Sequence, residues 1–149
     1  MRFTGTITAR TDAKGRAFFP SSFRKVLATA GEENLMLTRD AFQPCLVVYP
    51  QSVWYAQLDA LGTGLSRWNA RERMVMREFV ANVEPVSLDS GGRLLIPKRY
   101  AAMVGIEQEV VFLGMDDTVE IWAPAVLEKN RMSATDFAAE LERIMGQKA

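Results

Sequence analysis

The chain begins with a stretch in which polar and apolar residues alternate. Residues 3–10 follow the two-residue period of a half-buried strand. The sequence DAKG at 12–15 then supplies a tight turn, and the apolar run at 17–19 predicts a return strand. Gly15 comes just before that strand, where a short loop commonly requires a positive φ that glycine adopts without steric cost. Together these segments predict a β-hairpin.

A short helix and a second pair of strands are expected next. Pro20 presets the backbone for the first helical turn, Ser21 or Ser22 can cap it, and Gly31 follows its last residue. Beyond the helix, apolar residues at 35–38 and 45–49 predict two further strands.

The same order of elements returns 77 residues later. Asp12 aligns with Asp89 at this offset, which also pairs Gly15 with Gly92, Arg16 with Arg93, Pro20 with Pro97 and Phe23 with Tyr100. The second copy predicts strands at 86–88, 94–96, 110–113 and 119–122, and a helix at 97–103. The chain therefore reads as a tandem duplication.

Helical patterns join the two copies and close the chain. Residues 52–61 and 66–83 predict two connecting helices, the second with Val75, Met76, Phe79 and Val80 on one face. Residues 125–145 predict one closing helix. The expected organisation is a first half at 1–55, a helical linker at 56–82, a second half at 83–124 and a C-terminal helix at 125–149.

Neither half is expected to fold alone. A hairpin with one short helix cannot bury enough apolar surface to offset its conformational entropy. Each half therefore needs the other, and two hairpins interleaving into one small β-barrel is the natural solution. The predicted fold class is α+β.

Composition excludes most catalytic chemistry. The chain has no histidine, so it lacks the commonest general base, the usual partner of a nucleophilic serine or cysteine, and the favoured nitrogen ligand of zinc. Cys45 is the one cysteine, which excludes an intrachain disulfide and a thiolate metal site. We expect neither an enzyme nor a metal or cofactor, and a buried, inert thiol at Cys45.

The chain is expected to be soluble with a local basic surface, and its single cysteine fits a reducing cytoplasm. The first ten residues have no continuous apolar run, and no segment has the length and composition of a membrane span, so we expect a soluble, unprocessed chain. Eighteen basic and eighteen acidic residues cancel. Residues 1–25, however, hold six basic residues and one acidic, a net charge of +5, and residues 87–105 hold three and one, a net charge of +2.

The repeated Asp-x-x-Gly-Arg sequence has two interpretations, a structural turn and a nucleic-acid contact, and the spacing alone does not distinguish them. Aspartate at the start of a turn accepts hydrogen bonds from backbone N–H groups, so the motif fits a purely structural turn. A turn does not require arginine after the glycine in both copies, however. The arginine fork suits phosphate oxygens and the guanine edge, and a two-stranded ribbon can enter a major groove.

With its two copies of this pattern, DAKGR before FFP and DSGGR before LIP, the sequence resembles the MraZ family of the AbrB-like swapped-hairpin class. The resemblance spans about the whole chain and includes the strand ending in YP before Trp54. It implies a double swapped-hairpin barrel, a DNA-binding transcriptional regulator of the division and cell-wall gene cluster, and ring-shaped homo-oligomers.

The candidate site follows from the motif and the basic residues around it. The resemblance implies DNA contact by Asp12, Arg16, Asp89 and Arg93, and Lys14 adds charge to the first turn. Further phosphate contacts are expected at Arg10, Arg24, Lys98 and Arg99. The second turn has Gly91 where Lys14 stands in the first, so the two turns are unequal. The expected partner is double-stranded DNA with repeats upstream of the protein's own operon, at the nucleoid.

An alternative stays open: a ring-forming scaffold with no direct DNA role, in which each Asp–Arg pair only locks its turn. For Trp54, Trp68 and Trp122, packing in the core or between subunits is favoured over base stacking.

Overall fold

The computed structural model describes residues 1–147. The first half contains β1 (Thr6–Arg10), β2 (Arg16–Phe18), α1 (Ser21–Ala30), β3 (Leu35–Arg39) and β4 (Leu46–Pro50). Helices α2 (Gln51–Thr63) and α3 (Ala70–Ala81) follow. The second half contains β5 (Glu84–Val86), β6 (Arg93–Leu95), α4 (Lys98–Met103), β7 (Glu109–Met115) and β8 (Thr118–Trp122), and α5 (Pro124–Lys129) and α6 (Ala134–Gly146) end the described chain. The repeated element order confirms the predicted mixed α+β plan.

Strands of one half pair largely with strands of the other. The main sheet has the order β1-β7-β8-β4-β3-β5, in which β1 pairs with β7, β4 with β8 and β3 with β5, all antiparallel. A separate two-stranded ribbon joins β2 to β6. Each half therefore completes the other, as the entropy argument requires.

The predicted hairpin of residues 3–19 is wrong in its pairing, although its turn forms. The Asp12 N–H donates to the Arg16 carbonyl at 2.8 Å, but β1 then pairs over five positions with β7, and β2 pairs with β6. A strand of three residues such as β2 offers β1 fewer backbone bonds than β7 does. The longer partner is therefore favoured over the nearer one.

The predicted closed barrel is replaced by an open sheet with a ribbon. Within residues 1–147, β1 and β5 form the edges of the six-stranded sheet, and no strand pair joins them. Strands β2 (Arg16–Phe18) and β6 (Arg93–Leu95) pair with each other in the ribbon and not with the main sheet, and β5 is only three residues long. With those two segments in the ribbon and only three residues in β5, the β5 edge is too short to pair with β1, so the sheet stays open.

One core holds the two halves together. Phe19 from the first half packs edge-to-face on Phe112 from the second, with ring centroids 5.4 Å apart, and on Phe23 at 5.9 Å. The other large, fully buried side chains also come from both copies: Phe3, Leu35, Leu37, Leu46, Val48, Leu94, Ile96, Tyr100 and Ile121. Burial of these side chains supplies the apolar free energy that neither copy could supply alone.

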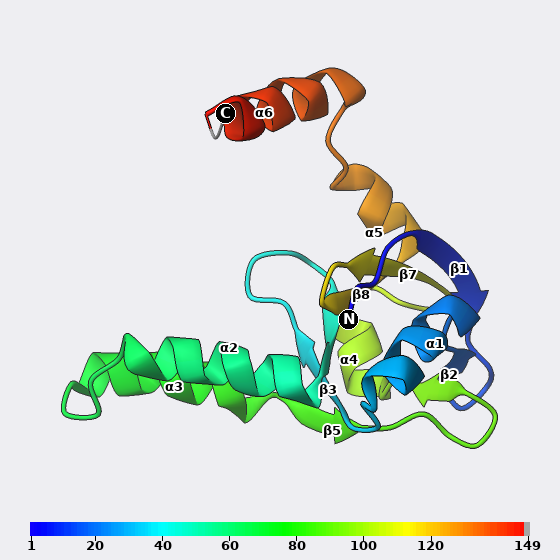
Figure 1. The fold of residues 1–149 in the computed structure, drawn as a ribbon. Helices are drawn as coiled ribbons and strands as arrows, with labels where there is room; N and C mark the ends of the chain where they lie inside the picture. The colour runs from blue at the N-terminus through cyan, green and yellow to red at the C-terminus, as the bar shows by residue number, and fades with distance from the viewer. Residues whose placement is uncertain (148–149) are drawn as a thin grey trace.

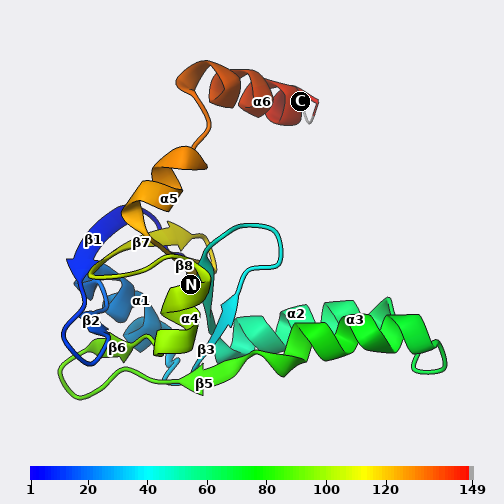
Figure 2. The same ribbon diagram turned by 180° about the vertical axis from the view of Figure 1, so that it is seen from behind.

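Two arms extend from this body (Figure 1). Helices α2 and α3 lie side by side as one arm, and the view from behind agrees (Figure 2). The Trp54 ring, buried at the base of the arm, stacks on Phe79 with centroids 4.7 Å apart and contacts Tyr49 edge-on. Trp122 is also buried, whereas Trp68 at the tip of the arm is 98% exposed and has no core role within this chain.

The second arm corrects the predicted single closing helix. Helix α5 ends at Lys129, where the Asn130 side chain donates to the Val126 carbonyl, and α6 starts after Ser133, whose hydroxyl accepts from the Asp136 N–H. Asparagine and serine side chains compete for backbone hydrogen bonds, so they end and start helices. Residues 130–133 therefore divide the segment into two helices.

Candidate nucleic-acid interface

The first repeated turn is organised around the Asp12 carboxylate. Its Oδ1 accepts hydrogen bonds from the backbone N–H groups of Lys14 and Arg16, both at 2.9 Å. Its Oδ2 accepts from the Arg16 Nε at 2.8 Å. The Asp-to-Arg spacing of four residues thus closes the turn and orients the guanidinium at the same time.

The second turn repeats this geometry. The Asp89 Oδ1 accepts from the N–H groups of Gly91 and Arg93 at 2.9 Å, and its Oδ2 accepts from the Arg93 Nε at 2.9 Å. The backbone bonds correspond too, because the Asp89 N–H donates to the Arg93 carbonyl at 2.9 Å. The sequence repeat is therefore a repeat of a bonded structure.

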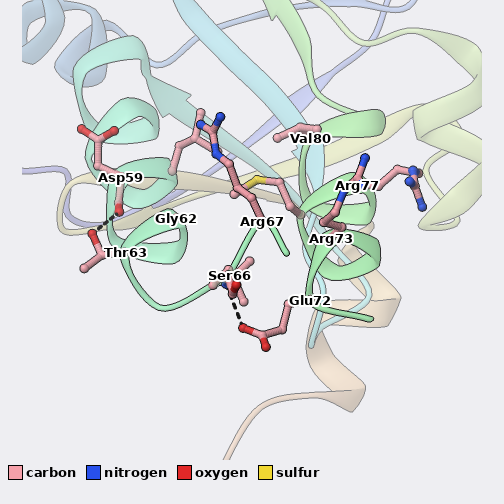
Figure 3. Close-up of a pocket in the computed structure, with 12 residues that line it drawn as sticks. Asp59, Gly62, Thr63, Ser66, Arg67, Glu72, Arg73, Arg77 and Val80 are labelled. Carbon is pink, nitrogen blue, oxygen red and sulfur yellow. Dashed lines mark hydrogen bonds between the residues drawn. The ribbon is translucent and has the colours of Figure 1, made fainter. Parts of the chain in front are cut away.

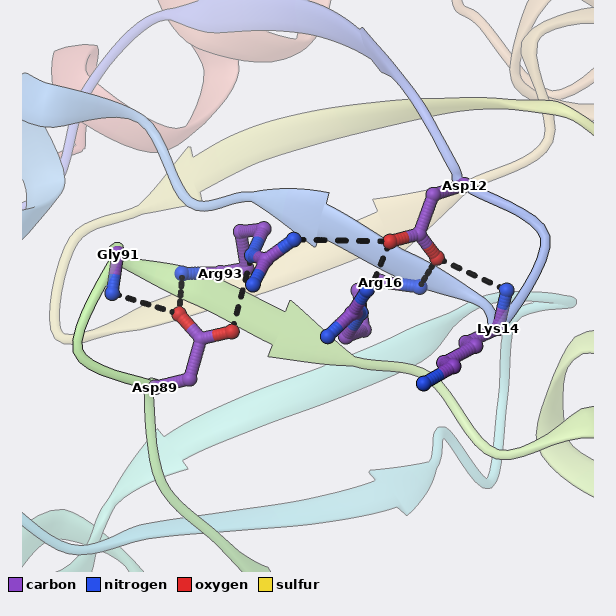
Figure 4. A network of polar contacts seen from close by, with 6 residues as sticks. All are labelled: Asp12, Lys14, Arg16, Asp89, Gly91 and Arg93. Carbon is purple, nitrogen blue, oxygen red and sulfur yellow. Dashed lines mark hydrogen bonds and ion pairs between the residues drawn. The ribbon is translucent and has the colours of Figure 1, made fainter.

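The two turns lie at opposite ends of the β2–β6 ribbon (Figure 4). Arg16 stands opposite Leu95 in the register, and Phe18 stands opposite Arg93. The ribbon also brings the Arg93 Nη1 to 3.8 Å from the Asp12 Oδ2, so the charged pairs of the two copies form one cluster. Residues 77 apart in sequence thus share one surface.

Glycine is required where each turn enters its strand. Gly15 has a φ of +85°, and a Cβ added there would lie 2.8 Å from the Ile96 carbonyl oxygen. Gly92 has a φ of +82° and lies against the Arg24 side chain. Both positions combine a left-handed backbone with a close approach, which excludes any other residue without strain.

The bonding pattern keeps both carboxylates ionised. The Arg16 backbone N–H, supported by its guanidinium, holds the pKa of Asp12 below its ordinary value. The Arg93 backbone N–H and charge do the same for the pKa of Asp89. Each arginine thereby keeps a charged partner on its Nε. Within residues 1–147, the hydrogen bonds of Arg16 engage its Nε and backbone N–H, which leaves the two terminal nitrogens of the fork for a ligand.

The additional candidate cations divide into two groups. Lys98, at the start of α4 in the second half, lines the cleft beside the first turn, and Arg24 of α1 lines the cleft beside the second turn. Arg10 and Arg99 are instead engaged elsewhere: Arg10 donates to the Gln108 side chain at 3.4 Å, and Arg99 lies over the Tyr100 ring and 3.7 Å from the Glu84 carboxylate. The second turn lacks a counterpart of Lys14, but Arg24 brings positive charge to it from the other half.

Sequence reasoning missed two apolar members of this surface. Phe18 is 61% exposed and Leu95 is 48% exposed on the ribbon face that carries Arg16 and Arg93, while Ala17 and Leu94 point into the core. Strand alternation around the buried positions could have identified them, since a three-residue strand with a buried centre must turn its flanking residues outward. The candidate surface is therefore mixed, with arginine and apolar side chains next to each other.

Besides this surface, the metal-ligand, thiol and helix-length features of residues 1–147 bear on function. No group of three or more Asp, Glu, Cys or His side chains within residues 1–147 is arranged to hold a metal ion. Cys45 is fully buried, as expected, and burial raises the pKa of its thiol. Among the described helices, none has the length and apolar character needed to cross a membrane.

Fold and site together define a class: a tandem-duplicated α+β protein whose halves share one core and present two equivalent Asp–Arg turns on one ribbon. The family model described as "MraZ protein, putative antitoxin-like" matches residues 2–78 and again 79–146. The chain belongs to the MraZ family.

Curated relatives match nearly the whole chain. A protein of Phocaeicola vulgatus is 50% identical over 98% of this chain and 95% of its own, and one of Bacteroides thetaiotaomicron is 47% identical over 97% and 93%. A protein of Christiangramia forsetii is 37% identical over 95% and 92%. All three bear the name "Transcriptional regulator MraZ".

Proposed function

We propose that this protein is a transcriptional regulator that binds double-stranded DNA through the β2–β6 ribbon and its two turns. The observation that carries the proposal is the placement of Arg16 and Arg93, each half-buried and oriented by its own aspartate, on one face of a single chain. The names of the relatives support the regulatory role.

The geometry suits DNA on physical grounds. A two-stranded ribbon is narrow enough to enter the major groove, and an arginine fork matches either phosphate oxygens or the O6/N7 edge of guanine. Asp12 and Asp89 hold the forks in one orientation, which lowers the entropy cost of each contact. Phe18 and Leu95 are exposed on the same face, and apolar side chains in a major groove can contact thymine methyl groups. Lys14, Lys98 and Arg24 add phosphate contacts at the turns.

The family resemblance supplies the finer parts of the proposal. The target is a set of repeats upstream of the protein's own operon, in the division and cell-wall gene cluster, and the protein acts at the nucleoid in the cytoplasm. Its interleaved halves represent the swapped-hairpin arrangement, and the working form is a ring of identical subunits. A ring explains how a subunit with zero net charge can bind DNA tightly. Several weak contacts in one assembly gain about 10²–10⁴ in avidity when their spacing matches the DNA.

A gel-shift series with the region upstream of the operon tests the proposal. Wild-type protein is expected to retard this fragment and to retard a shuffled fragment of the same length only at higher concentration. Arg16→Ala is expected to lose the specific shift at the protein concentrations at which wild type gives it, while the oligomer persists. Arg131→Ala, which also removes one cation but lies between α5 and α6, is the matched control and should bind as wild type. Equal binding by Arg16→Ala would reject the ribbon as the interface.

One observation favours the competing scaffold role. Each aspartate makes two bonds to backbone N–H groups within its own turn, so the pair would be needed for folding even without DNA. On this alternative, Asp12→Ala and Arg16→Ala lower the melting temperature together, and no DNA is retarded even at low salt. The bonds of the Asp12 side chain to the turn backbone exist on either role, so retardation of DNA by the wild-type protein is the result that separates the two.

A further inference from the structure

Helix α6 presents an apolar face that its own chain leaves uncovered. Phe137, Leu141, Ile144 and Met145 follow helical spacing on one side and are each 44–57% exposed. A helix of 13 residues is marginal in water by itself, and most helical stability comes from packing an apolar face. Helix α6 therefore needs a partner surface.

The root of α6 is fixed to the body. Leu127 of α5 packs in a buried cluster with Cys45, Val111 and Trp122. From there residues 130–133 lead to α6, which stands away from both the sheet and the α2–α3 arm in two opposite views (Figures 1 and 2). The helix is thus held out from the molecule with its apolar face free.

The arm formed by α2 and α3 carries an apolar groove of matching character. The groove has a volume of about 770 Å³, and its apolar lining comes from Phe42, Ala60, Leu61, Met74, Val75 and Phe79. Phe42 is 91% exposed, and its loop is held by the Asp40 carboxylate, which accepts from the backbone N–H groups of Phe42 and Gln43. A large exposed aromatic side chain on an ordered loop is a feature of an interaction surface.

The charges of the two elements are complementary. Residues 134–146 hold three acidic residues and one basic, a net charge of −2, whereas residues 51–81 hold four basic and three acidic, a net charge of +1. The charged residues at the apolar groove itself are Arg71 and Glu78, which balance, while Arg67, Arg73 and Arg77 lie with Asp59 and Glu72 around the hollow that α2 and α3 form elsewhere on the arm (Figure 3). The preference therefore comes from the net charges: the acidic helix is attracted to the weakly basic arm and repelled by a second copy of itself.

We propose that α6 of one subunit occupies the α2–α3 groove of a second copy of this chain. This heterologous contact uses a different surface on each subunit, so repetition gives a ring if the rotation closes. This proposal rests on the homo-oligomer that is part of the proposed function, and it does not depend on DNA binding. Neither of the two docking surfaces includes a residue of the β2–β6 ribbon.

Cysteine cross-linking of full-length chains tests this placement, because the native Cys45 is buried. A tagged Val75→Cys chain and an untagged Leu141→Cys chain are co-expressed and oxidised mildly. The contact predicts a covalent dimer of one tagged and one untagged chain. Ala139→Cys lies about half a turn away from Leu141 around α6 and is the matched control, for which cross-linking with Val75→Cys should be several-fold weaker.

Two results would overturn the proposal. One is equal cross-linking at Ala139 and Leu141. The other is a disulfide that forms only within a single chain of the Val75→Cys/Leu141→Cys double variant, which would mean that α6 folds back on its own arm. Leu141→Glu provides a second measurement, since it should lower the mass of the assembly in light scattering and keep the melting transition of the body. DNA binding by any of these variants reports on the proposed function separately.

Discussion

At the residue scale, the carboxylates and glycines of the two turns set the geometry of the site. Asp12 and Asp89 each accept three hydrogen bonds, and Gly15 and Gly92 each adopt a left-handed backbone. The sequence predicted this much, because turn chemistry is local and depends on residue type and spacing. It did not predict that Arg24 would lie against the second turn, since that contact joins two different halves.

Gly15→Ala is expected to destabilise the protein by about 1–2 kcal/mol, the cost of a left-handed backbone for a residue with a Cβ. The added atom would also meet the Ile96 carbonyl oxygen at 2.8 Å. Gly91→Ala is the matched control in the equivalent turn, because its Cβ would be in ordinary contact at 3.4 Å with the Asp89 carboxylate and its φ is not positive. Thermal melts should separate the two by several degrees, and equal melting temperatures would contradict this account of Gly15.

Acid should weaken both turns. The pKa of each aspartate is lowered on folding, so the stability it contributes is present above the unfolded value of about 3.9 and is lost as the pH falls through the folded value. The melting temperature of Asp12→Asn/Asp89→Asn should lie below that of wild type at pH 7. This gap should narrow once the pH falls below about 3.9. A gap that stays constant down to about pH 2.5 would show that the charge of these groups does not stabilise the turns.

At the element scale, the strands could be located from sequence more reliably than their partners. The apolar periods at 35–38, 110–113 and 119–122 correspond to β3, β7 and β8. The predicted hairpin failed because pairing is decided by tertiary competition, and β1 gains more bonds from β7 than from β2. The single closing helix predicted at 125–145 is two helices, because the side chains of Asn130 and Ser133 bond to backbone groups at their ends. Such local bonds are not visible in a 3.6-residue apolar period.

The ribbon carries a prediction of its own. Phe18→Ala should weaken binding to the specific DNA by about 10-fold or more, the scale of one apolar contact, and leave the salt dependence unchanged because no charge is removed. Arg16→Ala should instead lower the slope of log affinity against log salt by about 0.9 for each phosphate that Arg16 neutralises. Fluorescence anisotropy at several salt concentrations measures both. A Phe18→Ala protein with wild-type affinity would remove Phe18 from the interface and leave the arginines in place.

At the scale of the whole molecule, duplication produces a body with two equivalent turns and two projecting arms. One core fixes the turns relative to each other, so a single chain presents two arginine forks in a defined geometry. On our proposals, the arms serve assembly and the ribbon binds DNA. The role of the turns was expected from the sequence, but the role of the arms could not be assigned from it, because the apolar periods of α3 and α6 predict packed faces without saying which molecule covers them.

The central claim is that the paired arginines of the ribbon bind DNA, and one titration tests it most directly. Labelled DNA from upstream of the operon is titrated by anisotropy with wild type, Arg16→Ala, Arg93→Ala and the control Arg131→Ala, after light scattering has shown equal assemblies. Each ribbon variant should bind more weakly by about 1–3 kcal/mol of binding free energy, and Arg131→Ala should match wild type. Wild-type affinity for both Arg16→Ala and Arg93→Ala, with the assembly intact, would contradict the account.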